Sequence, residues 1–176
     1  MTADTIIAAL EERFGAAIVG KKLDTIDPFV TVEADRLVEV CQFLRDDPRL
    51  AFALLNCITG VDYLETDPKK IAKAGYEPHL EVVYHMTSFN HGHRFVVKLM
   101  LPRWKDGMEG QLPEVPTVSH LWATADWHER ETFDLCGIHF TGHPDLRRIL
   151  LAEDWEGHPL RKDYQFPLEY HDIRCR

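Results

Sequence analysis

Hydrophobic and polar residues follow a helical period in two segments of the N-terminal half. Apolar side chains recur three and four positions apart over Asp4–Phe14 and again over Asp35–Arg45, which places them on one face of a helix. An aspartate opens the first segment and Gly15 follows it, as expected at the two ends of a helix. The spacing predicts two amphipathic helices, with a short extended segment at Phe29–Val32 between them.

A period of two residues marks the middle of the chain. Apolar and polar positions alternate over Leu80–Met86 and Arg94–Leu101, and the intervening Asn and Gly suit a hairpin loop. The apolar run Leu50–Leu64 is interpreted as a buried strand, although its periodicity also fits a buried helix. The stretch Glu65–Pro78 is interpreted as a surface loop. Both hairpin strands keep apolar residues on their second face, so we expect helices on one side of the sheet and partial cover on the other.

The C-terminal part of the chain changes character. A helix is predicted over His120–Cys136, with Gly137 in the C′ position after its last turn. Beyond Phe140 the chain is rich in charge, punctuated by proline and too long for a simple loop, which is typical of a segment that wraps its own domain or a partner. We therefore predict an α+β fold, with a small mixed, mainly antiparallel sheet and helices packed on it. Residues 1–140 are the compact domain, and residues 141–176 are an extended, partner-wrapping C-terminal segment that is partly mobile in the isolated chain.

Composition narrows the classes of function. The 176 residues carry a net charge of -9, with 20 basic residues scattered among 29 acidic ones, so the basic stripe of a nucleic-acid-binding protein is missing. No apolar run approaches the ~20 residues of a membrane-spanning helix, and the N-terminus lacks the basic region of a secretory signal. Membrane contact is expected only through partners. The four cysteines show no CxxC spacing, which favours a reduced, cytoplasmic chain.

Recognisable catalytic motifs are missing from the sequence. Neither GxGxxG nor GxxxxGK[ST] occurs, and the zinc motif HExxH fails because Thr132 stands where the second histidine is needed. The ten histidines keep a small stand-alone metalloenzyme open as an alternative, with His128, His139 and His143 as ligands. Two pairs have the residue types of a nucleophile and a base without an orienting motif: Ser119 with His120, and Cys136 with His139. No residue is assigned as catalytic, cofactor-binding or metal-binding.

The block Glu129–Asp163 resembles the sequence pattern of the 30-kDa (C or J type) subunit of respiratory complex I. In that family, Glu-Arg-Glu is followed by Asp, Gly-Ile, Phe-x-Gly-His-Pro, a Leu-x-Arg step and Gly-x-Pro-Leu-Arg-Lys-Asp. Two departures are visible: Cys136 stands where an aromatic residue or Met is usual, and two extra residues separate Tyr164 from Pro167. The matching positions are Glu129, Arg130, Glu131, Asp134, Gly137, Ile138, Phe140, Gly142, His143, Pro144, Leu146, Arg148, Gly157, Pro159, Leu160, Arg161, Lys162 and Asp163.

The resemblance implies a cofactor-free structural subunit in the hydrophilic arm of a proton-translocating NADH:quinone oxidoreductase. It implies that FMN and iron–sulfur clusters belong to partner subunits. The implied partners are the large quinone-site (49-kDa or D-type) subunit and other arm subunits, at the cytoplasmic side of the cell inner membrane. Related subunits occur in membrane-bound hydrogenases and other quinone oxidoreductases, so an equivalent arm subunit of such a complex stays open.

Glu129 lies in the apolar stripe of the predicted motif helix, where an unpaired carboxylate is costly. A guanidinium can hold a carboxylate with two bonds. We therefore hypothesise that Glu129 pairs with an arginine of the following segment: Arg147, Arg148 or Arg161. The alternative is that the helix breaks near Ala125 and Glu129 faces solvent.

Other charges of the block have two interpretations each. Arg130 lies one helical turn from Asp126 and from Asp134, which indicates either a solvated charge ladder or charges offered to a partner. The run Arg161–Asp163 is either an exposed charge run or a docking element for a partner's groove. The two Gly-His-Pro motifs predict turns that their histidines stabilise through hydrogen bonds: His143 and His158.

Overall fold

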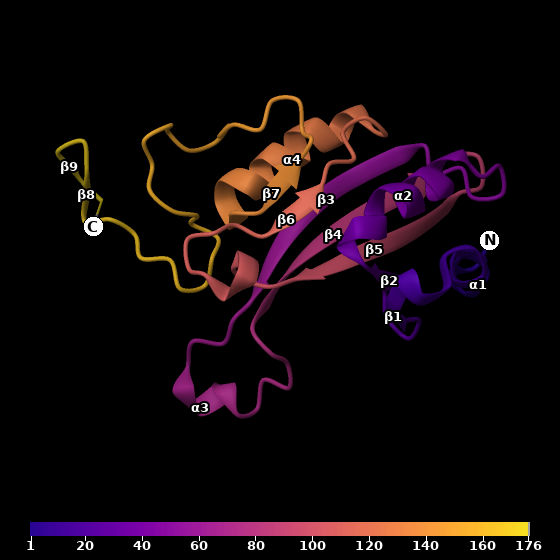
Figure 1. The fold of residues 1–176 in the computed structure, drawn as a ribbon, viewed down its shortest axis with the longest axis horizontal. Helices are drawn as coiled ribbons and strands as arrows, with labels where there is room; N and C mark the ends of the chain where they lie inside the picture. The colour runs from indigo at the N-terminus through magenta and orange to yellow at the C-terminus, as the bar shows by residue number, and fades with distance from the viewer. Residues whose placement is uncertain (176) are drawn as a thin grey trace.

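One five-stranded sheet organises the computed structural model, which describes residues 1–175 (Figure 1). The strands follow the order β1-β2-β5-β4-β3, with β2 and β5 parallel and the other neighbours antiparallel. The predicted mixed, mainly antiparallel sheet is therefore confirmed. The strand bounds are β1 Ile18–Lys22, β2 Phe29–Val32, β3 Leu54–Tyr63, β4 His79–Ser88 and β5 His93–Leu101.

Helices pack on one face of this sheet and form a single core with it. Leu10, Leu44 and Ala125, from three different helices, belong to the same buried cluster as Tyr84 and Val97 of the central strands. The helices are α1 Ala3–Phe14, α2 Leu37–Asp46, α3 Pro68–Ile71 and α4 Ala123–Cys136. Short 3₁₀ turns are Gly15–Ala17, Ala34–Arg36 and Lys105–Gly107. Two small sheets pair β6 Glu114–Pro116 with β7 His139–Thr141, and β8 Glu169–Tyr170 with β9 Ile173–Arg174.

Most elements predicted from periodicity are confirmed. The two N-terminal helices, the strand at Phe29–Val32 and the hairpin of β4 and β5 form where the patterns placed them. The predicted loop before the hairpin contains the short helix α3. The motif helix begins at Ala123 rather than His120, because Trp122 is still extended. The short strands β1, β6 and β7 were not predicted.

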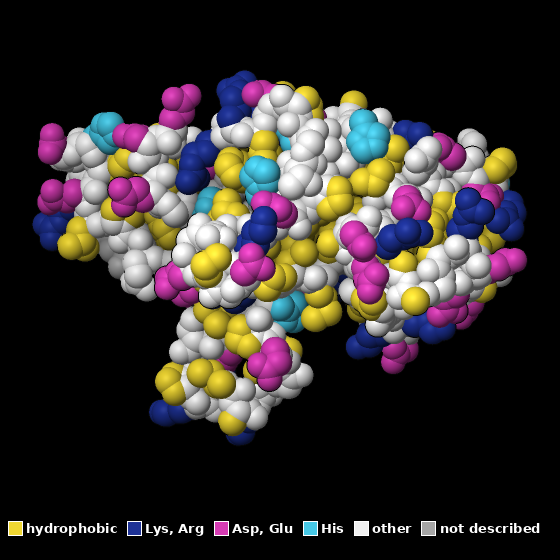
Figure 2. Space-filling model, in the orientation of Figure 1, with side chains coloured by type: hydrophobic (Ala, Val, Ile, Leu, Met, Phe, Trp, Pro, Cys, Tyr) yellow, Lys and Arg dark blue, Asp and Glu magenta, His cyan; other side chains and the backbone are white. Residues whose placement is uncertain are grey.

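The second face of the sheet has a mixed character. Lys98 donates a hydrogen bond to Glu81 at 2.9 Å and lies over the ring of Phe29, 4.3 Å from its centroid, while Met100 is 54% exposed. Figure 2 shows the molecule from the side on which α2 and α4 lie over the strands, and there charges of both signs are interspersed with apolar side chains. The expectation that helices cover one side is confirmed, and the other side presents a polar and aromatic surface.

The C-terminal segment runs back along α4 after β7 and then extends to the hairpin of β8 and β9, away from the sheet (Figure 1). Its first part contacts the compact domain closely, and Arg161 is only 6% exposed. The segment thus wraps its own helix before it leaves the domain. Partner wrapping by its remainder, and its mobility in the isolated chain, stay predictions.

Candidate functional site

The motif block is built around the C-terminal end of α4. Gly137 ends the helix in the left-handed conformation, with φ +68, and its N–H donates to the carbonyl of Phe133 at 3.0 Å. A Cβ at this position would lie 2.4 Å from Cδ2 of His158. Conformation and space therefore both require glycine here, and the predicted C′ position is confirmed.

Glu129 is fully buried, but no arginine pairs with it within residues 1–175. Its carboxylate accepts hydrogen bonds from the hydroxyl of Thr117 and from the N–H of Val118, the latter at 2.7 Å. The hypothesis of an arginine partner is therefore wrong, and so is the alternative of a solvent-facing Glu129. The physical reason lies in the pairing of β6 with β7, which brings the backbone after β6 onto the middle of α4.

The environment of Glu129 makes ionisation costly. Burial raises its pKa to about 7, against the opposing effect of the hydrogen bonds from Thr117 and Val118. Nε2 of His143 lies 3.9 Å from the nearer carboxylate oxygen, which is too far for a hydrogen bond. Glu129 is therefore partly protonated near neutral pH, held by two donors that carry no charge.

His143 stabilises the first Gly-His-Pro turn, as predicted. The N–H of Asp145 donates to its Nδ1 at 3.1 Å, so the ring proton lies on Nε2 and is donated to the carbonyl of Asp126 at 3.2 Å. The side chain is fully buried, and Gly142 before it has φ +80. The turn thereby connects the C-terminal segment to the first half of α4.

Asp134 is the acid that holds an arginine. Its carboxylate accepts from Arg148 at 2.7 Å and from three successive backbone N–H groups at 2.8 to 3.0 Å: Ile149, Leu150 and Leu151. Burial opposes ionisation most strongly, but these four donors together outweigh it and lower the pKa of Asp134. A cluster of backbone N–H groups is a typical anion site, and here the anion is a side chain of the same domain.

Arg161 closes the end of α4. Its guanidinium donates to the carbonyls of Cys136, Gly137 and Arg103, each at 2.9 Å, and stacks on the ring of Trp104 at 3.9 Å. Carbonyls in the last turn of a helix lack partners inside the helix, and a cation is favourable there. Arg161 thus fixes the C-terminal segment by capping the helix.

The other carbonyls of the last turn are also satisfied by the same segment. His158 donates from Nδ1 to the carbonyl of Asp134 at 2.9 Å, which confirms a hydrogen-bonding role for this histidine. The N–H of Leu160 donates to the carbonyl of Leu135 at 2.9 Å. Arg148, which holds Asp134, also donates to the carbonyl of Gly157 at 3.0 Å. These motif residues therefore form one hydrogen-bond network that joins the C-terminal segment to the last turn of α4.

A second ion cluster joins the end of the block to the sheet. Arg103 donates to both oxygens of Asp62, at 2.8 and 2.9 Å, and to both oxygens of Asp163, at 2.8 and 2.9 Å. The N–H of Lys162 donates to Asp62 at 2.9 Å. Sequence reasoning missed Arg103 and Asp62. An acid inside the apolar run that forms β3 was the available signal for Asp62, because a buried carboxylate needs a partner.

The remaining block residues lie on α4 or in the turns that follow it. Arg130 is 4% exposed and lies 3.7 Å from Asp126 and 3.8 Å from Asp145, so the solvated ladder is wrong for this residue. The predicted pair with Asp134 does not form, because Arg148 and the backbone occupy that carboxylate. Arg147 is exposed and pairs with Asp145 at 2.9 Å. Glu131 is half-exposed, and Pro144 and Pro159 lie in the two turns.

The enzymatic alternatives find little support in the geometry. No group of three His, Cys, Asp or Glu side chains within residues 1–175 is arranged to hold a metal ion, so His128, His139 and His143 do not converge. Burial raises the pKa of the Cys136 thiol to about 11, which leaves it protonated and unreactive at neutral pH. Among the described residues no helix has the length and apolar character to cross a bilayer.

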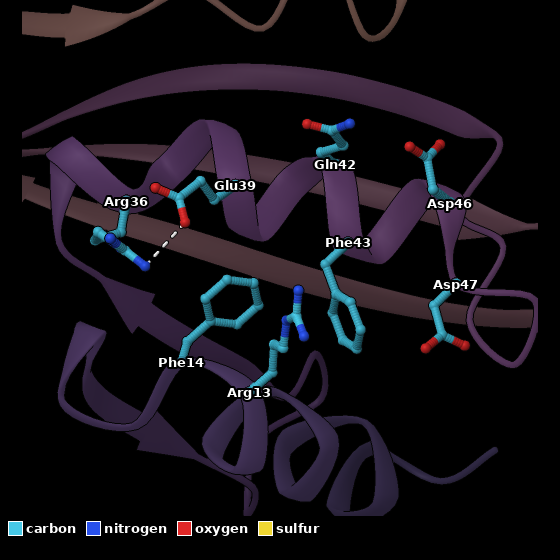
Figure 3. A pocket seen from close by; sticks show the side chains of 8 residues that line it. All are labelled: Arg13, Phe14, Arg36, Glu39, Gln42, Phe43, Asp46 and Asp47. Carbon is cyan, nitrogen blue, oxygen red and sulfur yellow. Dashed lines mark ion pairs between the residues drawn. The ribbon is translucent and has the colours of Figure 1, made fainter.

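A separate hollow of about 730 Å³ lies between α1 and α2 (Figure 3). The rings of Phe14 and Phe43 meet edge to face at 5.6 Å at its base, and Arg36 pairs with Glu39 at 2.8 Å on its rim. None of the motif residues lines this hollow. The motif block therefore lies apart from this hollow.

Comparison with known proteins places this geometry in context. The family model described as "Respiratory-chain NADH dehydrogenase, 30 Kd subunit" matches residues 30–170. The C-type subunit of NADH-quinone oxidoreductase from Roseiflexus castenholzii is 46% identical over 159 residues, which cover 90% of this chain and 82% of that protein. The protein of the same name from Chlorobium phaeobacteroides is 41% identical over 166 residues, covering 94% of this chain and 90% of that protein.

A solved structure shares the fold. It is described as the membrane-bound sulfane sulfur reductase (MBS), an archaeal respiratory membrane complex, and one of its chains superposes with a TM-score of 0.67 at 24% sequence identity. The superposition covers 92% of this chain and 85% of that chain. The sheet, its helices and much of the C-terminal segment are therefore an arrangement that also occurs in a distant chain.

Proposed function

The chain belongs to the 30-kDa subunit family of the respiratory-chain NADH dehydrogenase, and from this premise we propose that it is a structural subunit of the hydrophilic arm. It docks against the large quinone-site subunit and supports electron transfer from NADH to quinone in a proton-translocating complex. The chain itself binds no cofactor and supplies no catalytic residue; FMN and the iron–sulfur clusters belong to partner subunits. It is peripheral, on the cytoplasmic side of the inner membrane.

One observation carries this proposal: the motif block uses its charges to close a helix end. The carboxylate of Asp134 and the guanidinium of Arg161 each have three or more partners within this chain. Groups saturated in this way are not free to transfer protons or to hold a metal. A rigid scaffold that presents a continuing C-terminal segment is suited to assembly.

Purification of the native complex tests the proposal. A tag on this chain, expressed at its natural level, is used to recover it from gently solubilised membranes. We expect the large quinone-site subunit and NADH:quinone oxidoreductase activity in the same fraction. Recovery of this chain alone, without the large subunit, refutes the proposal. An untagged strain provides the control for adventitious recovery.

An equivalent arm subunit of another respiratory complex is the second candidate. This candidate is supported by the fold that the chain shares with a chain of the archaeal respiratory membrane complex. The same purification separates the two: a nickel–iron large subunit in the recovered fraction selects a membrane-bound hydrogenase, whereas NADH-dehydrogenase subunits select the first candidate. Stoichiometric zinc or iron in the purified chain alone would instead favour the stand-alone metalloenzyme.

A further inference from the structure

The carboxyl group of Glu129 is fully buried, yet it forms one end of a chain of hydroxyl groups. Its Oε2 is hydrogen-bonded to Oγ1 of Thr117, and this Oγ1 lies 2.8 Å from Oγ of Ser119. The N–H of Ser119 also donates to Oγ1 of Thr117, at 3.1 Å. Glu129 and Thr117 are buried, whereas Ser119 is partly exposed. The hydroxyl chain therefore runs from the interior of the domain to its surface.

The hydroxyl of Thr117 carries a single proton, so it cannot donate to Glu129 and to Ser119 at the same time. When Glu129 is ionised, Ser119 donates to Thr117, and Thr117 donates to the carboxylate. When Glu129 is protonated, the carboxyl group donates to Thr117, and Thr117 donates to Ser119. In both arrangements Oγ1 of Thr117 donates once and accepts twice, since it also accepts from the N–H of Ser119. The same positions of the oxygen atoms therefore satisfy both charge states of the acid.

The other groups around Glu129 on the sheet side do not offer its proton a way out. Its second hydrogen bond comes from the N–H of Val118, at 2.7 Å, and a backbone amide does not release its proton near neutral pH. Burial, together with the charge of Glu129, raises the pKa of the Cys41 thiol and of the Tyr84 hydroxyl. Both groups therefore stay neutral beneath the carboxyl group.

The groups on the side of the C-terminal segment are occupied as well. Nε2 of His143 lies 3.9 Å from the carboxyl oxygen of Glu129 and donates instead to the carbonyl of Asp126, at 3.2 Å. Nδ1 of the same ring accepts from the N–H of Asp145. Burial and, to a smaller extent, the charge of Asp126 raise the pKa of Glu129, and no Lys or Arg within residues 1–175 forms an ion pair with it. Thr117 is thus the one hydrogen-bonded exit among these described groups.

We propose that Glu129 is a proton-binding site of the folded protein and that its proton exchanges with solvent through the hydroxyls of Thr117 and Ser119. On release, the carboxyl proton passes to Oγ1 of Thr117. The proton of that hydroxyl passes to Oγ of Ser119, and the proton of Ser119 passes to water. Each hydroxyl gains one proton and loses one, so only the carboxyl group changes its charge. Transfer between groups within hydrogen-bond reach is the usual geometry of proton transfer.

The consequence is a joint that changes its charge without opening. The hydroxyl chain lies where the segment after β6 meets α4, and the folded chain takes up or releases one proton there near neutral pH. Every group involved belongs to this chain, so the inference does not depend on the proposed function.

Infrared titration of the full chain tests the site. A protonated carboxyl group absorbs at a higher frequency than a carboxylate, so its band can be followed by itself. We expect such a band to disappear as the pH is raised from about 6 to about 8 and to be missing from Glu129→Gln. The exposed control Glu12→Gln should keep it. A band that survives in Glu129→Gln, or a spectrum without any carboxyl band that titrates in this range, overturns the inference.

Proton uptake after a light-induced pH jump tests the route, with the same infrared band as the readout. Ser119→Ala interrupts the hydroxyl chain and should slow the uptake by at least about tenfold. Thr117→Ser retains the hydroxyl and should match the wild type. Ser88→Ala is the matched control and should also match it, because the hydroxyl of Ser88 is buried without a hydrogen-bond partner within residues 1–175.

Local opening of the site is the competing route. The N–H of Val118 is bonded to the carboxyl group, so its hydrogen exchange reports how often this site opens. Uptake through the hydroxyls should be faster than this opening and should depend on Ser119. Circular dichroism verifies that each variant is folded. Uptake at the opening rate, equal in the wild type and in Ser119→Ala, overturns the hydroxyl route.

Discussion

Two acids on one helix, both fully buried, differ in their charge. Glu129, in the middle of α4, has one hydroxyl and one backbone N–H as donors, and burial raises its pKa to about 7. Asp134, near the end, has an arginine and three backbone N–H groups, and its pKa is lowered despite burial. Burial alone does not decide whether a carboxylate is charged; the number and charge of its donors decide it.

The difference also separates two kinds of attachment. The middle of α4 is joined to the segment after β6 by hydrogen bonds from Thr117 and Val118 to Glu129, whose carboxyl group is partly protonated near neutral pH. The end of α4 is joined to the C-terminal segment by ions and by helix capping. The ionic end should therefore dominate stability, and the neutral middle should dominate the response to pH near neutrality.

The largest effect is expected from Asp134→Ala. The substitution leaves Arg148 and three backbone N–H groups without their acceptor, and removal of one partner from a buried pair costs roughly 3–5 kcal/mol. Urea unfolding of the full chain, followed by circular dichroism, measures the loss. The exposed Asp154→Ala is the matched control and should leave stability nearly unchanged. Equal stability of the two variants would contradict the anchoring role of Asp134.

Arg161→Ala should have the next largest effect. It removes charge-assisted bonds to three carbonyls, with a loss on the order of 3 kcal/mol. Arg161→Lys keeps the charge but cannot reach all three carbonyls in one plane. The stability of this variant should therefore fall between that of the wild type and that of Arg161→Ala. Hydrogen exchange at the Leu160 amide should accelerate in the same order. If the lysine variant matches the wild type, the planar geometry of the guanidinium is not needed.

Glu129 should control the pH dependence between about pH 4.5 and 7. The unfolded chain loses this proton near its ordinary pKa of 4.5, whereas the folded chain keeps it to about 7. The unfolded state therefore binds fewer protons in this interval, and stability falls as the pH rises, by at most ~3 kcal/mol. Asp134 acts in the opposite sense. Because its pKa is lowered in the folded chain, the stability that it contributes is lost only at more acidic pH.

Glu129→Gln removes the titrating proton but keeps an acceptor of the same shape. The variant should show a flatter stability curve between pH 5 and 7.5 and should exceed the wild type at pH 8. Unfolding midpoints across this range, with Glu12→Gln as the exposed control, measure the effect. A variant with the wild-type slope would assign the pH dependence to another group.

The smallest effect is expected from Asp163→Asn. Asp163 is 45% exposed on its side chain, and Arg103 retains its two bonds to the buried Asp62. The loss should stay below about 1 kcal/mol and should shrink further with added salt. Asp62→Asn should cost more and respond less to salt. The reverse order would mean that the exposed pair, rather than the buried one, holds this part of the segment.

Prediction from sequence succeeded where the determinants are local. The helices α1 and α2, the hairpin and the glycine after α4 follow from periodicity and from backbone conformations that neighbouring residues specify. The small sheet of β6 and β7 was missed because each strand has only three residues and pairs across more than twenty positions. Arg103 escaped notice because its partners, Asp62 and Asp163, lie far from it in the sequence.

The sequence by itself determined the fold class, the family block and the need of buried Glu129 for a partner. Only the tertiary structure decided that this partner is Thr117 with Val118, and that the arginines serve Asp134 and the helix end. The physical reason is that periodicity reports which face of an element is buried, whereas donors and acceptors are matched by distances between segments that come together only in the folded chain.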